Sequence, residues 1–266
     1  MSLTTENSIL ETKDLNIGYP LKKSIEIIQR NISVRLFRGE FVTIIGKNGI
    51  GKSTLLRTLS RVQEAISGEI LLNSKNIELY NSKELSTIIS LVLTERLPES
   101  QLTVFELVAL GRQPYTNWVG KLEKKDIERI TWALEQTETA SLAKRHFYEL
   151  SDGQLQRVLI ARALAQDTEI IMLDEPTAHL DMHHTIKIFQ LLKRLSQKTK
   201  KTIVITTHEV NLAIKSADQL ILLTEKEVEA GKKEDLIARN SFDTLFSSEM
   251  VNFNASLEQF IMTKNS

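Results

Sequence analysis

The sequence predicts an α/β fold: a mostly parallel sheet with flanking helices, an N-terminal antiparallel β subdomain and an inserted helical subdomain. Four continuous apolar runs lack the alternation of half-exposed strands, namely residues 41–45, 89–93, 170–173 and 202–205. Such runs are typical of strands covered on both faces, as in a parallel sheet. A glycine-rich segment, residues 46–53, follows the first run and opens a helix-like sequence. A strand, a glycine-rich turn and a helix in this order indicate a phosphate-binding loop.

The remaining elements can be placed in chain order. Residues 9–36 alternate loosely between apolar and polar side chains and predict two or three antiparallel strands. Residues 68–73 predict a further strand. Between the second and third apolar runs the pattern becomes helical. Thr103 and Glu106 form a capping-box pair that predicts a helix start, and Gly111 is expected to end that helix.

Helical patterning continues through residues 126–138 and 154–166. Residues 94–163 therefore predict a helical subdomain, inserted into a core that comprises residues 9–93 and 164–224.

After Asp181, four apolar side chains recur at the spacing of one helix face: Ile188, Leu191, Leu192 and Leu195. Residues 225–266 form a C-terminal extension, for which a short strand pair with helical turns is expected.

Composition excludes several function classes. Lys plus Arg and Asp plus Glu number 34 each, so no net charge favours binding to nucleic acid or anionic lipid. The chain has no cysteine, which excludes disulfides, thiolate metal sites and a cysteine nucleophile. No apolar run approaches the roughly 20 residues that cross a bilayer. The polar N-terminus, residues 1–10, lacks the apolar core of a signal peptide. We therefore expect a cytosolic protein that reaches a membrane only through a partner.

The glycine-rich segment fits the pattern GxxxxGK[ST] without a mismatch. Glycines let successive backbone N–H groups face inward, and the helix that follows adds its own free N–H groups. Lys52 supplies a positive charge for the outer phosphates, and Ser53 offers a hydroxyl to Mg²⁺. The predicted nucleotide-binding residues here are Gly46, Lys47, Asn48, Gly49, Ile50, Gly51, Lys52, Ser53 and Thr54.

Two carboxylates follow the third apolar run. Because neighbouring strand residues point to opposite sides, Asp174 and Glu175 are expected to have different roles. Asp174 suits Mg²⁺ binding, and Glu175 suits a general base that activates water.

These segments in this order resemble the ATP-binding subunit of an ATP-binding-cassette (ABC) transporter, a P-loop NTPase. The motifs that carry the resemblance are residues 46–53, 150–154, 173–176, 178–181 and His208. The resemblance covers essentially the whole chain and weakens after about residue 225. It implies ATP and Mg²⁺ as cofactors and ATP hydrolysis coupled to transport as the activity.

A narrower resemblance concerns the transported substrate. Residues 102–112, Pro114 and Tyr115 are similar to the importers of iron chelates (siderophores), haem and cobalamin, and residues 178–181 agree with that group. It implies import through a separate membrane permease, with a substrate-binding protein as an indirect partner. The chain would lie at the cytoplasmic face of the inner membrane.

The family resemblance also assigns roles across a homodimer. Ser151, Gly153 and Gln154 resemble the signature motif, which contacts the nucleotide bound to the opposite subunit. Ser151 can also cap the helix that follows it. Asp181 resembles the residue that couples the two nucleotide sites.

Two further positions match single residues of the family. Tyr19 resembles the aromatic residue that stacks on adenine; the alternative is a strand-end tyrosine that only fills the surface. His208 resembles the histidine that contacts the γ-phosphate and holds the attacking water.

The chain departs from the family pattern at two places. Asp152 occupies the position of the first signature glycine, and its side chain is expected to point away from the nucleotide. Thr94 stands where a glutamine usually reaches Mg²⁺ and the attacking water. Thr94 still offers a hydroxyl but is shorter than a glutamine. Glu95 or a bridging water is expected to make the contacts that Thr94 does not reach.

Two rival functions and one rival site stay open from the sequence. The chain could be a soluble ATPase that serves a cytosolic scaffold such as iron–sulfur assembly, or a nucleotide-gated binding module with little turnover. Three histidines, His179, His183 and His184, lie around Asp181, and the spacing of His179 and His183 would suit two metal ligands on one helix face. His179 is expected in the turn before that helix, however, and histidines at a helix start are more simply explained as solvated.

Overall fold

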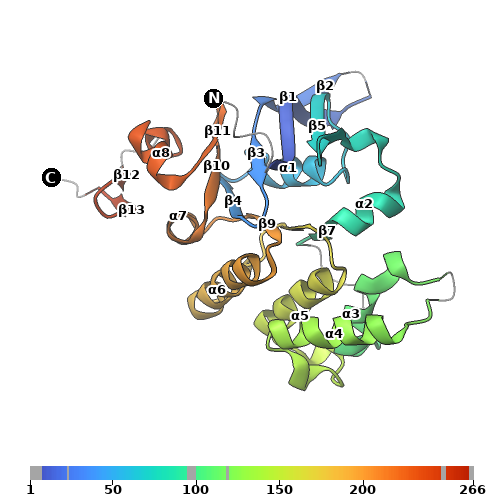
Figure 1. Ribbon diagram of the computed structural model, residues 1–266. Coiled ribbons are helices and arrows are strands. Elements are labelled where there is room, and N and C mark those ends of the chain that lie inside the picture. The colour runs from blue at the N-terminus through green and yellow to red at the C-terminus, as the bar shows by residue number, and fades with distance from the viewer. Residues whose placement is uncertain (1–7, 23, 95–99, 118–119, 247–249, 264–266) are drawn as a thin grey trace. The chain divides into compact units, whose positions relative to one another are not determined.

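The computed structural model describes residues 8–22, 24–94, 100–117, 120–246 and 250–263. The chain divides into two compact units (Figure 1). The first comprises Met1–Tyr80 and Thr202–Ser266, and the second comprises Asn81–Lys201. The second unit contains the helices of residues 94–163. The boundaries of the helical subdomain (94–163) and of the core (9–93 and 164–224) stay predictions from the sequence.

The first unit begins with an antiparallel sheet. Its strands are β1 (Ser8–Pro20), β2 (Ile25–Ile32), β3 (Arg35–Phe37), β5 (Ser67–Leu72) and β6 (Lys75–Asn76). β1 pairs antiparallel with β2, β3 and β5, and β6 pairs with β5. The strands predicted over residues 9–36 and 68–73 are confirmed.

A second sheet of the first unit is mostly parallel. Its strands are β4 (Phe41–Gly46), β9 (Thr202–Thr206), β10 (Gln219–Leu223) and β11 (Val228–Gly231). β4 runs parallel to β9 and β10, whereas β11 is antiparallel to β10. Every residue of β4, β9 and β10 is buried. Helices α1 (Lys52–Leu59) and α7 (Val210–Ser216) pack on β4, and α1 also packs on β1.

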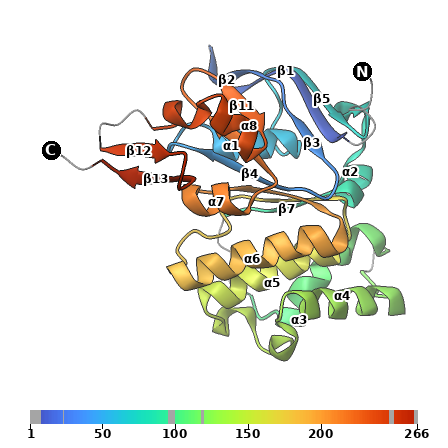
Figure 2. The same ribbon diagram turned by 60° about the vertical axis from the view of Figure 1, so that its left-hand side comes forward.

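The C-terminal segment of the first unit contains α8 (Lys233–Ala238) and a hairpin of β12 (Val251–Asn254) and β13 (Gln259–Met262). The strand pair predicted for this segment is confirmed. Phe242 stacks on Phe253 at 4.4 Å between ring centroids, and both rings contact Phe260. The amide of Asn211 in α7 hydrogen-bonds both backbone groups of Phe260, so the hairpin lies beside α7 (Figure 2).

The second unit joins two parallel strands to a group of helices. Its elements are α2 (Ser82–Ile88), β7 (Ile89–Val92), α3 (Val104–Ala109), α4 (Lys124–Gln136), α5 (Asp152–Ala165), β8 (Ile170–Leu173) and α6 (Met182–Thr199). β7 and β8 pair in parallel, as their apolar sequences predict. α5 packs on α3, α4 and β7. In α6 the four predicted apolar residues are all buried.

Short 3₁₀ turns connect the elements of both units: Ile77–Leu79, Leu110–Tyr115, Ala140–Leu142, Phe147–Glu149 and Ser241–Thr244.

The start of α3 agrees with the sequence prediction, but its end does not. Thr103 and Glu106 form the capping box. Gly111 does not end the helix, because α3 stops at Ala109 and a 3₁₀ turn continues through Gly111. A Cβ on Gly111 would lie 2.3 Å from the carbonyl oxygen of Arg162. Glycine is needed here for the close approach of α5 and not for a left-handed cap.

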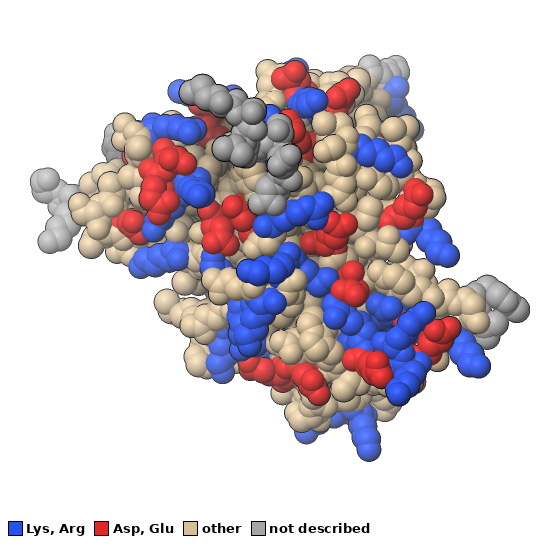
Figure 3. All heavy atoms as spheres, viewed as in Figure 1, with Lys and Arg blue, Asp and Glu red and all other residues tan. Residues whose placement is uncertain are grey.

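Among the residues that the structure describes, no helix is both long enough and apolar enough to cross a bilayer. On the face drawn in Figure 3, basic and acidic side chains are interspersed, which agrees with their equal numbers in the sequence.

Candidate functional site

The phosphate loop leaves the carboxyl end of β4 and enters α1. Its backbone turns sharply at Gly51, whose φ of 108° lies in the left-handed region that side chains disfavour. A Cβ on Gly51 would also lie 2.6 Å from Cγ2 of Ile28. The loop is therefore shaped for an N-terminus of α1 that is free of side chains. This is the geometry that a phosphate requires.

The ammonium group of Lys52 lies inside this loop. Nζ donates to the carbonyl oxygens of Gly46 at 3.0 Å and of Lys47 at 3.1 Å, and the residue is only 4% exposed. Nζ also lies 3.4 Å from Nδ1 of His208. An ammonium can only donate, so Nδ1 is the acceptor in this contact when the two atoms are hydrogen-bonded. The structure thus brings the predicted lysine and histidine together.

Two side chains connect the phosphate loop to the antiparallel sheet. The hydroxyls of Tyr19 and Thr54 are 2.9 Å apart, and Tyr19 is 42% exposed. A tyrosine ring that is held at the start of α1 and open to solvent can stack on a base. Gln29, which sequence reasoning did not identify, donates to the carbonyl oxygens of Ile50 at 3.2 Å and of Thr224 at 2.9 Å. It ties the loop to the end of β10.

The loop also carries an ion pair at its surface. Nζ of Lys47 lies 2.9 Å from the carboxylate of Glu225. The hydrogen bond from Lys47 and its charge lower the pKa of Glu225. Asn48 and Gly49, at the tip of the loop, are exposed.

In the second unit, the two predicted carboxylates lie in different environments. β8 ends at Leu173, so Asp174 and Glu175 both lie beyond the strand. The alternation of side chains along a strand therefore does not explain their different environments. Asp174 is 3% exposed and its N–H donates to the carbonyl of Val92 at 2.8 Å. Glu175 is partly exposed and has a φ of 46°. The backbone of Asp174 is thus held by β7 and its side chain is buried, whereas Glu175 is partly exposed and has a left-handed backbone conformation.

Thr94 is held against the same segment. Its hydroxyl donates to the carbonyl oxygen of Asp174 at 2.9 Å. Glu95, the other predicted substitute for the missing glutamine, lies outside the described residues.

The signature segment caps α5. Oγ of Ser151 accepts from the N–H of Gln154 at 3.4 Å, and the N–H of Ser151 donates to Oε1 of Gln154 at 3.1 Å. Gly153 is buried next to the imidazole of His184. Asp152 occupies the first helical position and is exposed. A carboxylate in the first turn is favourable for the helix dipole, so Asp152 stabilises the helix that carries the signature.

Asp181 caps α6. Its carboxylate accepts from the backbone N–H of His184 at 2.8 Å, and Nδ1 of His184 lies 2.9 Å away. The backbone hydrogen bond from His184 lowers the pKa of Asp181. His179 precedes the helix in the left-handed region, with a φ of 66°. Within the described part of the chain, no three His, Cys, Asp or Glu side chains are grouped as metal ligands would be.

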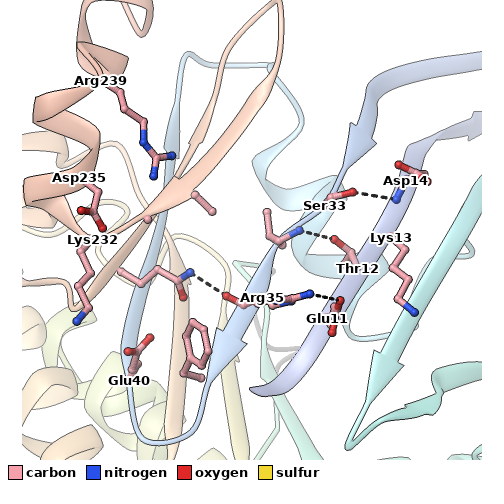
Figure 4. A pocket seen from close by; sticks show the side chains of 15 residues that line it. Glu11, Thr12, Lys13, Asp14, Ser33, Arg35, Glu40, Lys232, Asp235 and Arg239 are labelled. Carbon is pink, nitrogen blue, oxygen red and sulfur yellow. Dashed lines mark hydrogen bonds and ion pairs between the residues drawn. The ribbon is translucent and has the colours of Figure 1, made fainter. Parts of the chain in front are cut away.

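The first unit also contains a pocket of about 630 Å³ between β1, β3 and α8 (Figure 4). Arg35 pairs with Glu11 on one wall, and Arg239 points toward the pocket from the opposite side. Glu40 precedes β4 and Gln219 begins β10, so this pocket lies at the amino ends of the parallel strands. Ligands of such sheets bind at the carboxyl ends, where the phosphate loop lies.

Comparison with known proteins agrees with this geometry. The family model "ABC transporter" matches residues 29–178. The petrobactin import ATP-binding protein FpuD of Bacillus anthracis is 38% identical over 241 residues, which cover 90% of this chain and 87% of that protein.

Two solved structures share the fold. A metal-chelate type ABC transporter in an inward-facing conformation has a TM-score of 0.78 at 29% identity and covers 96% of both chains. A dimeric ATP-binding cassette in a post-hydrolysis state, bound to ADP and Pi, has a TM-score of 0.71 at 31% identity. It covers 84% of this chain and 98% of its own. The chain therefore belongs to the ATP-binding proteins of the ABC transporter family, and the reaction of this family is ATP hydrolysis.

Proposed function

We propose that the chain is the ATPase subunit of an importer that takes up an iron chelate (siderophore), haem or cobalamin through a separate membrane permease. The observation that carries this proposal is the similarity to a petrobactin import protein and to a metal-chelate type transporter, each over most of the chain. The chain would act at the cytoplasmic face of the cell membrane, attached through the permease. A substrate-binding protein would deliver the chelate to the permease.

Phosphate binding is assigned to the loop of residues 46–53 and to Thr54. The backbone N–H groups at the start of α1 would hold the phosphates, and the ammonium of Lys52 would exchange its carbonyl partners for phosphate oxygens. Tyr19 would stack on adenine; its exposed position beside Thr54 supports this role.

Mg²⁺ is assigned to the hydroxyl of Ser53 and the carboxylate of Asp174, with Thr94 as a further oxygen donor. These are hard oxygen ligands of the kind that Mg²⁺ prefers, and the burial of Asp174 limits competition from solvent. When bound, the ion would neutralise charge on the phosphate oxygens.

Glu175 and His208 are assigned to the attacking water. The carboxylate of Glu175 would accept a proton from water, and Nε2–H of His208 would donate to the γ-phosphate. The contact between Lys52 and Nδ1 supports this tautomer of His208.

The complete site is proposed to form between two copies of the chain. The start of α5, with Ser151, Gly153 and Gln154, would contact the nucleotide of the partner copy, and Asp181 would link the two sites. The dimeric state of the ADP-bound cassette supports this arrangement.

The chemistry is tested with Glu175→Gln. Loss of the base should reduce phosphate release by more than about 100-fold while ATP binding persists, because general-base catalysis contributes about 10²–10⁴ in rate. ATP should then hold a stable dimer, measured by size-exclusion chromatography. If Glu175→Gln hydrolysed ATP at the native rate, Glu175 would not be the general base.

The transport assignment needs a separate experiment. The chain should co-purify with its membrane permease, and its ATPase rate should rise with one member of a panel of iron chelates, haem and cobalamin. ATPase activity that is unaffected by the panel, in a chain that fractionates away from membranes, would favour a cytosolic scaffold ATPase.

A further inference from the structure

The threonine that replaces the family's glutamine is already engaged. The hydroxyl of Thr94 has one proton, which it donates to the backbone carbonyl of Asp174 at 2.9 Å. The side chain is also too short to reach as far as a glutamine. A carboxamide that helps to place the attacking water must therefore come from another position.

One face of α5 forms a wall of a cavity that also contains Thr94, Asp174 and Glu175. The cavity has a volume of about 500 Å³. α5 contributes four residues at the spacing i, i+3, i+4 and i+7, which is one helix face: Asp152, Leu155, Gln156 and Leu159. Gln156 lies between the two leucines and brings a carboxamide to the cavity in which Glu175 lies.

The carboxamide of Gln156 is available for this contact. The residue is half-buried, and no side chain or backbone group among the described residues hydrogen-bonds to its amide. Its neighbour Gln154 is different, because Oε1 of Gln154 accepts the N–H of Ser151 in the helix cap. This half-buried amide has no protein partner and shares with the carboxylates of Asp174 and Glu175 a cavity whose other walls are largely apolar, so it is suited to a contact with one of them.

We propose that Gln156 is a positioning residue for Glu175. Its Nε2–H would donate to the Glu175 carboxylate and hold it toward the attacking water. The family's glutamine at position 94 would reach the same water directly, so both carboxamides would serve to place it. A carboxamide is uncharged, so it orients the base without competing for the proton. The inference rests on the proposed ATPase function.

The test uses the purified full-length chain, steady-state phosphate release and two substitutions. Gln156→Met keeps the length of the side chain without the amide, and Gln156→Ala removes the side chain beyond Cβ. Both should lower kcat about tenfold or more and leave KM for ATP within about twofold, because misplacing a general base affects the reaction and not binding. Gln190→Ala is the control, since Gln190 is exposed on α6. It should hydrolyse at the native rate.

A second measurement does not depend on turnover. Vanadate traps ADP in a geometry like the transition state, so trapped ADP per chain should fall in Gln156→Met while ATP binding and the melting temperature stay native. In the double variant Thr94→Gln with Gln156→Met, the restored carboxamide should recover kcat to within about threefold of native.

The outcomes separate this inference from the proposed function. A native kcat in both Gln156 variants, or a loss that Thr94→Gln does not relieve, would overturn the role of Gln156. A loss seen only when the permease is present would also overturn it and assign Gln156 to permease contact. If the native chain hydrolyses ATP no faster than Lys52→Ala, the proposed function itself fails.

Discussion

At the scale of single residues, two glycines of the phosphate loop differ in what a side chain would meet. Gly51 has a φ of 108° and Gly49 a φ of 76°. A Cβ on Gly51 would overlap Ile28, whereas a Cβ on Gly49 would meet no atom within 4 Å. Gly49→Ala should therefore lower the free energy of unfolding only because a side chain disfavours the left-handed backbone, by about 1–2 kcal/mol. Gly51→Ala should lose more, because β2 must also move. Urea denaturation of both variants measures the difference, and equal losses would contradict it.

The contacts of Gln29 show what single-residue sequence reasoning could not provide. The residues that contact phosphate follow a pattern that chemistry dictates, so Lys52 and Ser53 can be identified from their spacing. Gln29 acts from a different sheet, through the carbonyls of Ile50 and Thr224. Backbone carbonyls carry no sequence signal, and Thr224 is separated from Gln29 by 195 positions. Gln29 is one of several polar residues in β2, so nothing in the sequence singles it out.

At the scale of elements, the caps of α3 and α5 form a matched pair. Thr103 and Ser151 both form capping boxes, and each accepts the N–H of the third helical residue. Thr103→Ala and Ser151→Ala should therefore cost a similar unfolding free energy, about 1 kcal/mol each. Only Ser151 is proposed to contact nucleotide across the dimer. We expect Ser151→Ala alone to weaken ATP-dependent dimerisation, measured by light scattering. If Thr103→Ala weakened dimerisation as much as Ser151→Ala does, Ser151 would act only as a helix cap.

A buried ion pair joins the 3₁₀ turn after α3 to α4, and it makes stability depend on pH. Nε of Arg112 donates to Asp126 at 2.9 Å, and Asp126 is 1% exposed. Burial acts to raise the pKa of Asp126, but the N–H of Glu123 and the Arg112 guanidinium hold it below its ordinary value of 3.8. A lowered pKa stabilises the fold above about pH 4 and loses that contribution as pH falls through the folded value. Thermal melting from pH 6 to pH 3 should therefore show a steeper decline for the native chain than for Asp126→Asn.

Most strongly patterned elements were predictable from the sequence, and weakly patterned ones were not. The parallel strands β4, β7, β8 and β9 follow from apolar runs, because strands that are covered on both faces are mostly apolar. β10 has the same character but was missed. α2 was also missed, although Asn81 and Glu84 form a capping box. It has no buried residue, so it lacks the apolar stripe that marks a helix. Gly111 was misassigned because its partner, the carbonyl of Arg162, is remote in sequence.

At the scale of the whole molecule, the proposed nucleotide site draws on two different parts of the chain. The phosphate loop with His208 belongs to the first unit, and the signature cap belongs to the second. In a two-fold dimer the same surface is used by both copies, so each site would take its loop from one copy and its signature from the other. A chain that is defective in one half should therefore be complemented by a chain that is defective in the other.

Mixing two inactive variants tests this arrangement directly. Lys52→Ala lacks the phosphate charge, and Ser151→Arg places a bulky side chain at the signature; each alone should be inactive. In an equal mixture about half of the dimers are mixed, and each mixed dimer has one site with two native halves. Phosphate release should therefore return to about a quarter of the native rate if the sites act independently. The control is the double variant Lys52→Ala with Ser151→Arg, mixed with native chain. Its mixed dimers have one defective half in each site, so the mixture should retain only the activity of its native homodimers, and a gain beyond this would show that both halves act within one copy.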